Sequence, residues 1–236
     1  MTEKVALIAD IHGNYSALLE VGSELAGDYP VAFAGDLLDY GPEPEACADY
    51  LLFGMNILRN GEGNPIGTFG NHDIAIRDAN YSRFRTEHGR KSAEWNRAVA
   101  EKSDIIKTFL NQEYCNRYGE MMICHGSDND PWYNLFSTDI QKMDEMIERN
   151  PSVEIFVVAH SHLQFKVNYN NRLFVNPGSV GQSRNGVSLA HYSILDLDTK
   201  EVDFKAVEYN IKSVADRIVD NPCLDNFLAT RLYLGI

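Results

Sequence analysis

Five of the seven histidines lie in short polar clusters that follow apolar, strand-like runs. The clusters are Asp10-Ile11-His12, Gly35-Asp36, Gly70-Asn71-His72-Asp73, His125-Gly126 and His160-Ser161-His162. Two carboxylates, one amide and five imidazoles from these clusters are oxygen and nitrogen ligands of the kind that divalent ions take in proteins. The set is large enough to hold two ions and still leave one imidazole free for proton transfer. It therefore suits hydrolysis of phosphate esters at a pair of metal ions.

The spacing inside two of the clusters favours shared ligation. Asp10 and His12 are two residues apart, as are His160 and His162. Side chains two apart on an extended strand point to the same face, so both members of a pair could reach one metal. Asp36 is less specific, because a carboxylate that follows a glycine can simply cap the next turn. As a ligand, however, its two oxygens would allow it to bridge two cations.

The cluster that begins at Gly70 divides into two kinds of role. Asn71 offers a neutral carbonyl oxygen to a metal, whereas the adjacent His72 would point elsewhere and could protonate a leaving group. We expect Asp73 to orient His72 and to raise its basicity. A tight turn is the alternative, since Gly-Asn is common in turns. Asp39 is interpreted as part of a turn, with at most an indirect contact to the site through another residue.

Each polar cluster follows a run that is predicted to be a buried strand, and these runs are residues 4–9, 31–34, 66–69, 120–124 and 154–159. Apolar spacing predicts helices over 18–25, 44–53, 138–150 and 211–234. Thr138 is expected to cap the helix over 138–150. Short strands are predicted over 165–207. Ligand sites in open α/β sheets gather at the carboxyl ends of the strands. Clusters that are far apart in the sequence should therefore meet at one edge.

The 236 residues are expected to form one domain, with insertions at about 78–118 and 127–137 that lie over the site. The first insertion is predicted to carry one long amphipathic helix, because Trp95, Val99 and Ile106 fall on one stripe. The second contains the aromatic loop of residues 130–136. Its aromatic side chains would either stack on a substrate or anchor the loop, with Trp132 and Phe136 in the core.

The composition is that of an ordinary globular protein, with 44% hydrophobic and 23% charged residues. A formal net charge of −13 argues against general nucleic-acid binding, which needs a clustered cationic surface. The four cysteines are scattered and form no CxxC pair, which favours a reduced protein over a disulfide framework. The N-terminus has no signal pattern and no run is long enough to cross a membrane, so a cytoplasmic location is expected.

Taken together, the motifs resemble those of the calcineurin-like metallophosphoesterases. The similarity is greatest to the compact bacterial and archaeal phosphodiesterases near the diadenosine-polyphosphate hydrolases. It rests on residues 10–14, 35–39, 70–73, 125–126 and 160–162, and the Asn-Pro-Gly-Ser-Val-Gly-Gln segment at 176–182 is also typical. The resemblance implies a two-sheet α/β sandwich flanked by helices, with a dinuclear metal site at one edge.

The resemblance also implies a role for each matched residue. Asp10, His12 and His162 would bind the first metal, Asn71, His125 and His160 the second, and Asp36 would bridge them. A hydroxide that bridges the metals would attack phosphorus in line, and His72 would protonate the leaving oxygen. Mixed oxygen and nitrogen ligation without thiolate points to Mn²⁺, or to iron with Zn²⁺.

The expected substrate is a small phosphodiester, a nucleotide or a dinucleoside polyphosphate. A protein or small-molecule phosphomonoesterase is an alternative, and so is a non-catalytic metal-binding scaffold on the same fold; the presence of His72 favours an enzyme. Arg184 is expected to contact a phosphate, and Asn14 to lie near the substrate. Residues 77–97 carry six basic and three acidic side chains, and the basic ones would either contact phosphates or form a solvated helix face.

Overall fold

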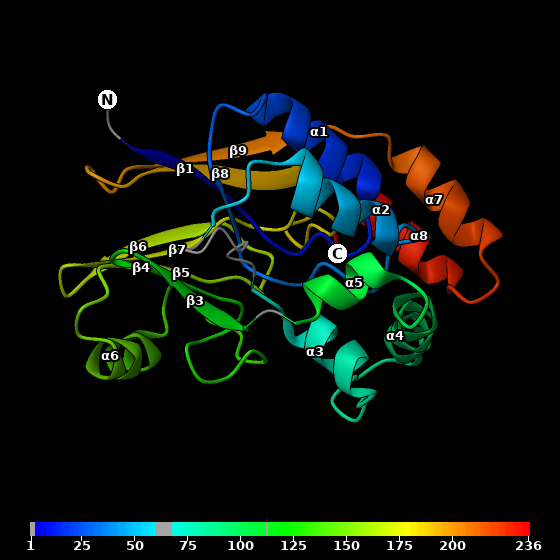
Figure 1. Cartoon of the computed structure of the whole chain (residues 1–236), viewed down its shortest axis with the longest axis horizontal. Coiled ribbons are helices and arrows are strands. Elements are labelled where there is room, and N and C mark those ends of the chain that lie inside the picture. The colour runs from blue at the N-terminus through cyan, green and yellow to red at the C-terminus, as the bar shows by residue number, and fades with distance from the viewer. Residues whose placement is uncertain (1–2, 60–67, 112) are drawn as a thin grey trace.

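Two mixed β-sheets lie face to face and are flanked by helices in the computed structural model, which describes residues 3–59, 68–111 and 113–236 (Figure 1). The first sheet has the order β2 (Val31–Phe33), β1 (Lys4–Ile8), β8 (Ala190–Asp196) and β9 (Val202–Val207). The second has the order β3 (Cys115–Tyr118), β4 (Met121–Cys124), β5 (Ile155–Val157), β7 (Arg172–Asn176) and β6 (Phe165–Tyr169). The predicted two-sheet α/β sandwich is confirmed.

Alternation along the strands builds the layers. In β1, Val5 and Leu7 face the second sheet, whereas Ala6 and Ile8 pack towards the helices on the outer side. In β5, Ile155 and Val157 join the core between the sheets, and Phe156 packs outwards. Strands that are buried on both faces read as continuous apolar runs, which is why these two are visible in the sequence.

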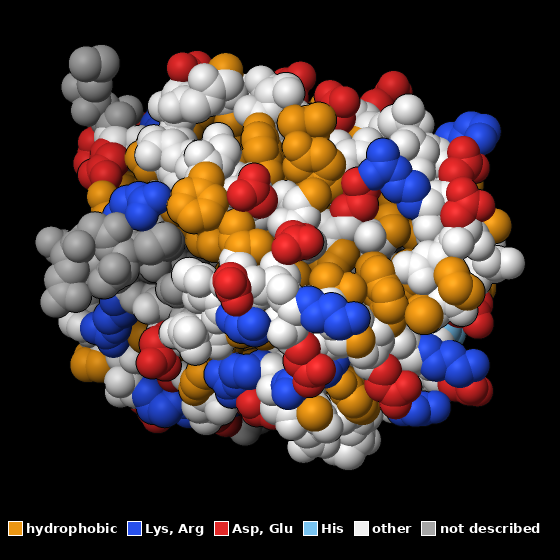
Figure 2. Space-filling view, turned by 45° about the vertical axis from the view of Figure 1, so that its right-hand side comes forward, with side chains coloured by type: hydrophobic (Ala, Val, Ile, Leu, Met, Phe, Trp, Pro, Cys, Tyr) orange, Lys and Arg blue, Asp and Glu red, His pale blue; other side chains and the backbone are white. Residues whose placement is uncertain are grey.

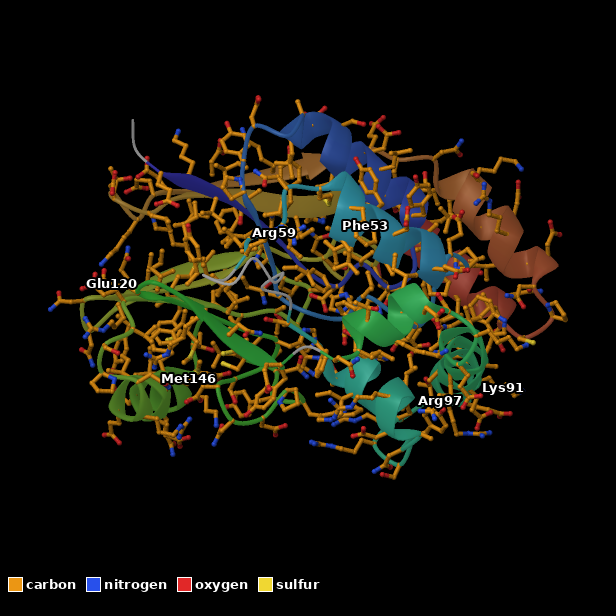
Figure 3. The ribbon with its side chains drawn as sticks, in the orientation of Figure 1. Phe53, Arg59, Lys91, Arg97, Glu120 and Met146 are labelled. Atoms are coloured by element: carbon orange, nitrogen blue, oxygen red, sulfur yellow. The ribbon has the colours of Figure 1, made fainter. Side chains whose placement is uncertain are left out.

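Helices cover the outer face of each sheet, and α1 (Tyr15–Leu25), α2 (Pro44–Asp49) and the π-helical turn η1 (Tyr50–Gly54) lie over the first. Helix α6 (Ile140–Arg149) covers the second sheet through Met143 and Met146, which are both fully buried. Met146 is labelled in Figure 3, as is Phe53, which is 75% exposed at the end of η1. At the helix-rich end of the molecule lie α3 (Asn71–Asp78), α4 (Glu87–Ala100), α5 (Asp104–Phe109), α7 (Ile211–Asp220) and α8 (Asn226–Leu234).

The helix predicted within residues 78–118 is wrong as a single element. The chain there forms α4, α5 and strand β3 in place of one long helix. Thr86 caps α4 by accepting from the Gly89 amide, and Ser103 begins a new helix while its hydroxyl donates to Glu45 at 2.6 Å. The Ser103 side chain makes no cap hydrogen bond, and its bond to Glu45 instead ties the break between the two helices to α2.

Three smaller expectations also need correction. Helix α6 begins at Ile140 with Asp139 at its cap, and Thr138 makes no capping box. The predicted C-terminal helix is two helices, because Pro222 lies between α7 and α8 and cannot continue a helix. Of the strand predicted at 66–69, residues 66–67 lie outside the described residues, and Thr68 forms only an isolated bridge with Glu113.

Within the described residues, no helix has both the length and the apolar character that crossing a membrane requires.

Candidate metal centre

Loops at the carboxyl ends of four strands meet at one edge of the sandwich. Asp10 and His12 follow β1, and Asp36 follows β2, which is parallel to β1. His125 follows β4, and the His160 to His162 segment follows β5, which is parallel to β4. The two sheets are joined here, because the His125 Nδ1 hydrogen-bonds to the Ala34 carbonyl at 2.8 Å. The convergence expected from the strand ends is present.

The backbone of these loops is left-handed rather than extended. The φ angles are 51° at Asp10, 48° at His12, 56° at Asp36, 66° at His160 and 61° at His162. The expectation that Asp10 and His12 share a face on an extended strand is therefore wrong, as it is for His160 and His162. Left-handed φ costs about 1 kcal/mol or more at a residue other than glycine, and such conformations gather at functional sites.

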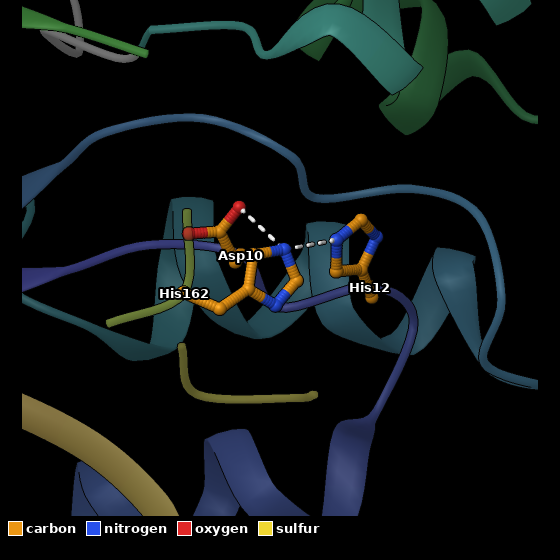
Figure 4. A group of neighbouring side chains, drawn as sticks. All are labelled: Asp10, His12 and His162. Carbon is orange, nitrogen blue, oxygen red and sulfur yellow. Dashed lines mark hydrogen bonds and ion pairs between the residues drawn. The ribbon is translucent and has the colours of Figure 1, made fainter. Parts of the chain in front are cut away.

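Asp10, His12 and His162 form the first candidate metal site, and their ligand atoms lie within 4.8 Å of one another (Figure 4). The His162 Nε2 is 3.2 Å from Asp10 Oδ1 and 3.4 Å from His12 Nε2. The Nδ1 of each imidazole hydrogen-bonds to a backbone carbonyl. His12 bonds to the Leu38 carbonyl at 3.0 Å, and His162 bonds to the Gln182 carbonyl at 2.5 Å. When Nδ1 donates, Nε2 carries a lone pair, so two lone pairs face each other. A cation between them would remove that conflict.

Asp36, His125 and His160 form the second candidate site. The His125 Nε2 lies 3.1 Å from Asp36 Oδ2 and 3.0 Å from Asn71 Oδ1, which brings the amide to this site. The same Asp36 oxygen is 3.7 Å from the His12 Nε2 of the first site. The Asp36 carboxylate therefore lies between the two groups, while its other oxygen accepts from the His72 amide at 2.9 Å.

The protein compensates the two carboxylates at this edge unequally. Burial lowers the pKa of His125, but Asp36 at 3.1 Å outweighs it and raises that pKa to about 9, so His125 compensates Asp36 better than any group compensates Asp10. Asp10 and Asp36 are fully buried, and both oxygens of Asp10 and Oδ2 of Asp36 have no hydrogen-bond partner. Burial, with the nearby Asp36, raises the pKa of Asp10 from 3.8 to about 7. Burial also lowers the pKa values of His12 and His162 well below 6.5, which leaves them neutral as ligands must be. Orphaned carboxylates beside neutral imidazoles fit metal ions, and the donors are oxygen and nitrogen without thiolate.

His72 stands beside both groups, and Asp39 rather than Asp73 orients it. The His72 Nδ1 is 2.6 Å from Asp39 Oδ2, and the Tyr40 hydroxyl is 3.4 Å from His72 Nε2. Burial lowers the pKa of His72, but Asp36 and Asp39 outweigh it, so the pKa is raised. The expected partnership with Asp73 is wrong. The sequence allowed Asp39 at most an indirect role and gave no role to Tyr40, because both resemble turn residues.

Asp73 instead closes the loops around the site. Its two oxygens accept from the backbone amides of Leu37 at 3.2 Å, Leu38 at 2.9 Å and Gly70 at 2.9 Å. It lies in the first turn of α3, where a carboxylate commonly bonds to the amides at the start of the helix. The consequence is structural, since the Asp36 loop and the start of α3 are tied together.

A cleft of about 530 Å³ opens above His72, Asn71 and His160. Arg184 lines it, which agrees with the expected position of a phosphate contact. Asn14 does not lie in it: its oxygen accepts from Ala17 at 3.1 Å to cap α1, and its amide donates to the Gly181 carbonyl at 2.9 Å. Both ends of that buried side chain are in use, and the expected substrate contact at Asn14 stays a prediction.

The two predicted insertions both contribute to the cleft. Phe84 and Trp132 pack against His72, with ring centroids 4.9 Å and 6.5 Å away. Neither Trp132 nor Phe136 is in the core, and Phe136 is 43% exposed, so Leu135 is the residue that anchors this loop.

Three of the six basic side chains of residues 77–97 form a solvated face of α4. Arg90 pairs with Glu94, Lys91 with Glu87 and Arg97 with Glu101. Lys91 and Arg97 are labelled in Figure 3. On the helix-rich face, basic and acidic side chains are interspersed (Figure 2). Only Arg83 and Arg85 of the six line the cleft.

Comparisons with known proteins agree with this geometry. Residues 3–204 match the calcineurin-like phosphoesterase family. An uncharacterised protein of Methanocaldococcus jannaschii is 26% identical, over 98% of each chain. A metallophosphoesterase from Sphaerobacter thermophilus has a TM-score of 0.78 and 24% identity over all of both chains. A hypothetical protein from Pyrococcus horikoshii has a TM-score of 0.81 and 20% identity over 99% and 98% of the two chains. The resemblance seen in the motifs is confirmed, and the chain belongs to the calcineurin-like phosphoesterase family as a metal-dependent hydrolase of phosphate esters.

Proposed function

We propose that the chain hydrolyses a small phosphodiester, a nucleotide or a dinucleoside polyphosphate at two metal ions. The observation that carries the proposal is the Asp36 carboxylate, whose Oδ2 lies within 4 Å of an imidazole from each ligand group, at 3.1 Å from His125 and 3.7 Å from His12. Asp10, His12 and His162 would hold one ion. Asn71, His125 and His160 would hold the other, with Asp36 shared.

Two ions held in this way would activate water and take up charge on the phosphoryl oxygens. The donor set favours Mn²⁺, or iron with Zn²⁺. The carbonyls of Leu38, Gln182 and Ala34 fix the three imidazoles whose Nδ1 they bind, so the ligand nitrogens are oriented before any ion enters.

His72 is the proposed general acid. Its Nδ1 is held by Asp39 at 2.6 Å, which leaves Nε2 as the nitrogen that faces the cleft beside the Tyr40 hydroxyl. The raised pKa favours the protonated ring, which can give a proton to the departing oxygen. Phe84 and Trp132 pack against the ring, with centroids 4.9 Å and 6.5 Å away.

The test uses protein that is stripped of metal and reconstituted with Mn²⁺, Zn²⁺ or Fe²⁺, with bound metal counted in each sample. Initial rates would be compared on bis-p-nitrophenyl phosphate, p-nitrophenyl phosphate and diadenosine tetraphosphate. We expect turnover that requires metal and saturates at two ions per chain. Two bound ions without turnover on any substrate would instead favour a metal-binding scaffold.

The proton-donor role needs a comparison of leaving groups. We expect His72→Ala to reduce the rate about 100-fold or more on a nucleoside 2′,3′-cyclic phosphate, whose alkoxide leaving group must be protonated, and much less on bis-p-nitrophenyl phosphate, whose leaving group needs little protonation. His191→Ala is the matched control, since His191 lies on β8 and hydrogen-bonds to Asn185. Equal losses on both substrates in His72→Ala would remove the general-acid assignment.

A further inference from the structure

The cleft above the metal centre is lined by four arginines, although the chain as a whole is strongly acidic. They are Arg83, Arg85, Arg184 and Arg231. Elsewhere in the described residues, most lysines and arginines pair with a nearby carboxylate, as Arg149 does with Asp128 at 2.6 Å. Arg184 forms no ion pair with a carboxylate of the described residues, whereas the Nε of Arg231 donates to the oxygen of the last residue, Ile236, at 2.9 Å. The charge of Arg184 is therefore the more available of the two to an anion from solution.

Arg184 is the better placed of the two. It follows Gln182, whose carbonyl holds the His162 imidazole at 2.5 Å, so its position is tied to the first ligand group. The Nε of Arg184 is buried and has no hydrogen-bond partner. An unsatisfied buried donor is costly, and a bound oxygen would satisfy it. Next to burial, Arg184 is the strongest influence that lowers the pKa of His162, which agrees with this proximity.

Arg231 reaches the same wall from α8. Its guanidinium lies 5.2 Å from the centre of the Tyr40 ring, and Tyr40 in turn contacts His72. In the amide orientation that satisfies both groups, the Gln182 side-chain oxygen accepts from Arg231 at 2.5–2.9 Å. Gln182 thus links the two arginines: its backbone leads to Arg184, and its side chain holds Arg231.

The opposite wall is aromatic. Trp132 and Phe84 meet edge to face with centroids 6.1 Å apart, and the Arg83 guanidinium lies 4.7 Å from the Trp132 ring. Arg83 is also 3.6 Å from Asp130, so its charge is partly compensated, unlike that of Arg184. The cleft volume of about 530 Å³ is much larger than one phosphate group requires.

We propose that Arg184 and Arg231 form a subsite for a second phosphate group of the substrate, beside the phosphate that is cleaved. The preferred substrates would then be nucleotides with at least two phosphates, such as nucleoside or dinucleoside polyphosphates. This inference rests on the proposed function, because the metal centre must hold the phosphate that reacts. The arginines bind the neighbouring phosphate and thereby fix which phosphorus faces the metals.

The kinetic test compares Arg184→Gln and Arg231→Gln on two substrates. We expect kcat/KM for diadenosine tetraphosphate to fall about 10- to 100-fold in each variant, as for loss of one charged hydrogen-bonding partner. The value for bis-p-nitrophenyl phosphate, which has a single phosphorus, should fall by a clearly smaller factor. Arg90→Gln is the matched control, since Arg90 pairs with Glu94 on α4 and does not line the cleft. Equal losses on both substrates, or none on diadenosine tetraphosphate, would overturn the subsite.

A binding measurement separates the subsite from the chemistry. Calorimetric titration of the Mn²⁺-loaded protein with ADP and AMP should give at least tenfold tighter binding of ADP in the wild type. In Arg184→Gln the two affinities should be nearly equal, and Arg184→Lys should recover part of the difference. If the wild type turns over no substrate yet prefers ADP in this way, the proposed function fails and the subsite stands. Equal affinities for ADP and AMP in the wild type would refute the subsite even if turnover is observed.

Discussion

Replacing Asp10 with asparagine should make the metal-free protein more stable, although it should damage metal binding. The Asp10 carboxylate is fully buried, and neither of its oxygens has a hydrogen-bond partner. The His162 Nε2, on an imidazole whose low pKa leaves it neutral, lies 3.2 Å from its Oδ1. The His125 Nε2 lies 3.8 Å from the same oxygen and lowers the pKa of Asp10, but burial outweighs it. A charge that is buried in this way opposes folding unless a cation compensates it.

The magnitude follows from the pKa of Asp10, which burial raises from 3.8 to about 7. Because the folded state holds the proton more tightly than the unfolded state, this group favours folding at low pH. That contribution is lost as the pH rises from about 4 through about 7. At about 1.4 kcal/mol per pH unit, the full loss is about 4 kcal/mol. Asparagine carries no charge to lose, so at pH 8 it should raise the melting temperature by about 10 °C.

The assay is thermal unfolding at pH 5 and pH 8, with EDTA or with saturating Mn²⁺. Without metal, Asp10→Asn should be more stable than the wild type at pH 8. This difference in stability should be smaller at pH 5. Ions at 100 times their Kd should stabilise the wild type by about 2.7 kcal/mol, and the variant by less. Asp203→Asn is the control, because Asp203 is 64% exposed on β9. An Asp10→Asn protein that is folded but no more stable than the wild type at pH 8 without metal would refute the reasoning.

Asp39→Asn should lower kcat about 10- to 100-fold with little change in KM. Because Asp39 raises the pKa of His72, and the acid must be protonated to act, the alkaline limb of the pH–rate profile should move to lower pH. Asp73→Asn should mainly cost stability, about 1–3 kcal/mol in urea unfolding, since its carboxylate accepts three backbone amides. Met146→Ala should cost about 2–5 kcal/mol in the same assay, whereas Phe53→Ala, at a side chain that is 75% exposed, should stay within about 0.5 kcal/mol.

The sequence was most informative where strands are buried on both faces. The runs that end before Asp10, Asp36, His125 and His160 are almost wholly apolar, and each does end at the shared edge of the sandwich. Parallel pairing brings neighbouring carboxyl ends together, so a polar residue directly after such a run must lie near that edge of the sheet. That is why the convergence of the candidate ligands could be predicted without a structure.

Local conformation after the strand ends could not be read in the same way. Asp10 and His12 were expected on one face of an extended strand, yet the backbone is left-handed at both residues. Their ligand atoms come together through this left-handed backbone and not through strand alternation. The His160 to His162 segment behaves alike, and its two imidazoles enter different ligand groups. Residues other than glycine adopt this conformation only when the surroundings impose it, and those surroundings come from distant segments.

The same physical reason accounts for the partner of His72. Asp73 is next to it in sequence, but at the start of α3 that carboxylate is taken up by backbone amides. Asp39 lies 33 residues away and reaches the imidazole only because the loop after β2 folds back over the site. Arg231, on the last helix, enters the cleft by an equally long-range route. The candidate metal ligands directly follow strands and can be found from the local sequence. The groups that shift the pKa of His72 or would bind the substrate lie on loops and helices that only tertiary packing brings to the site. Substrate preference should therefore be sought in residues such as Arg184 and Arg231, outside the motifs that identify the family.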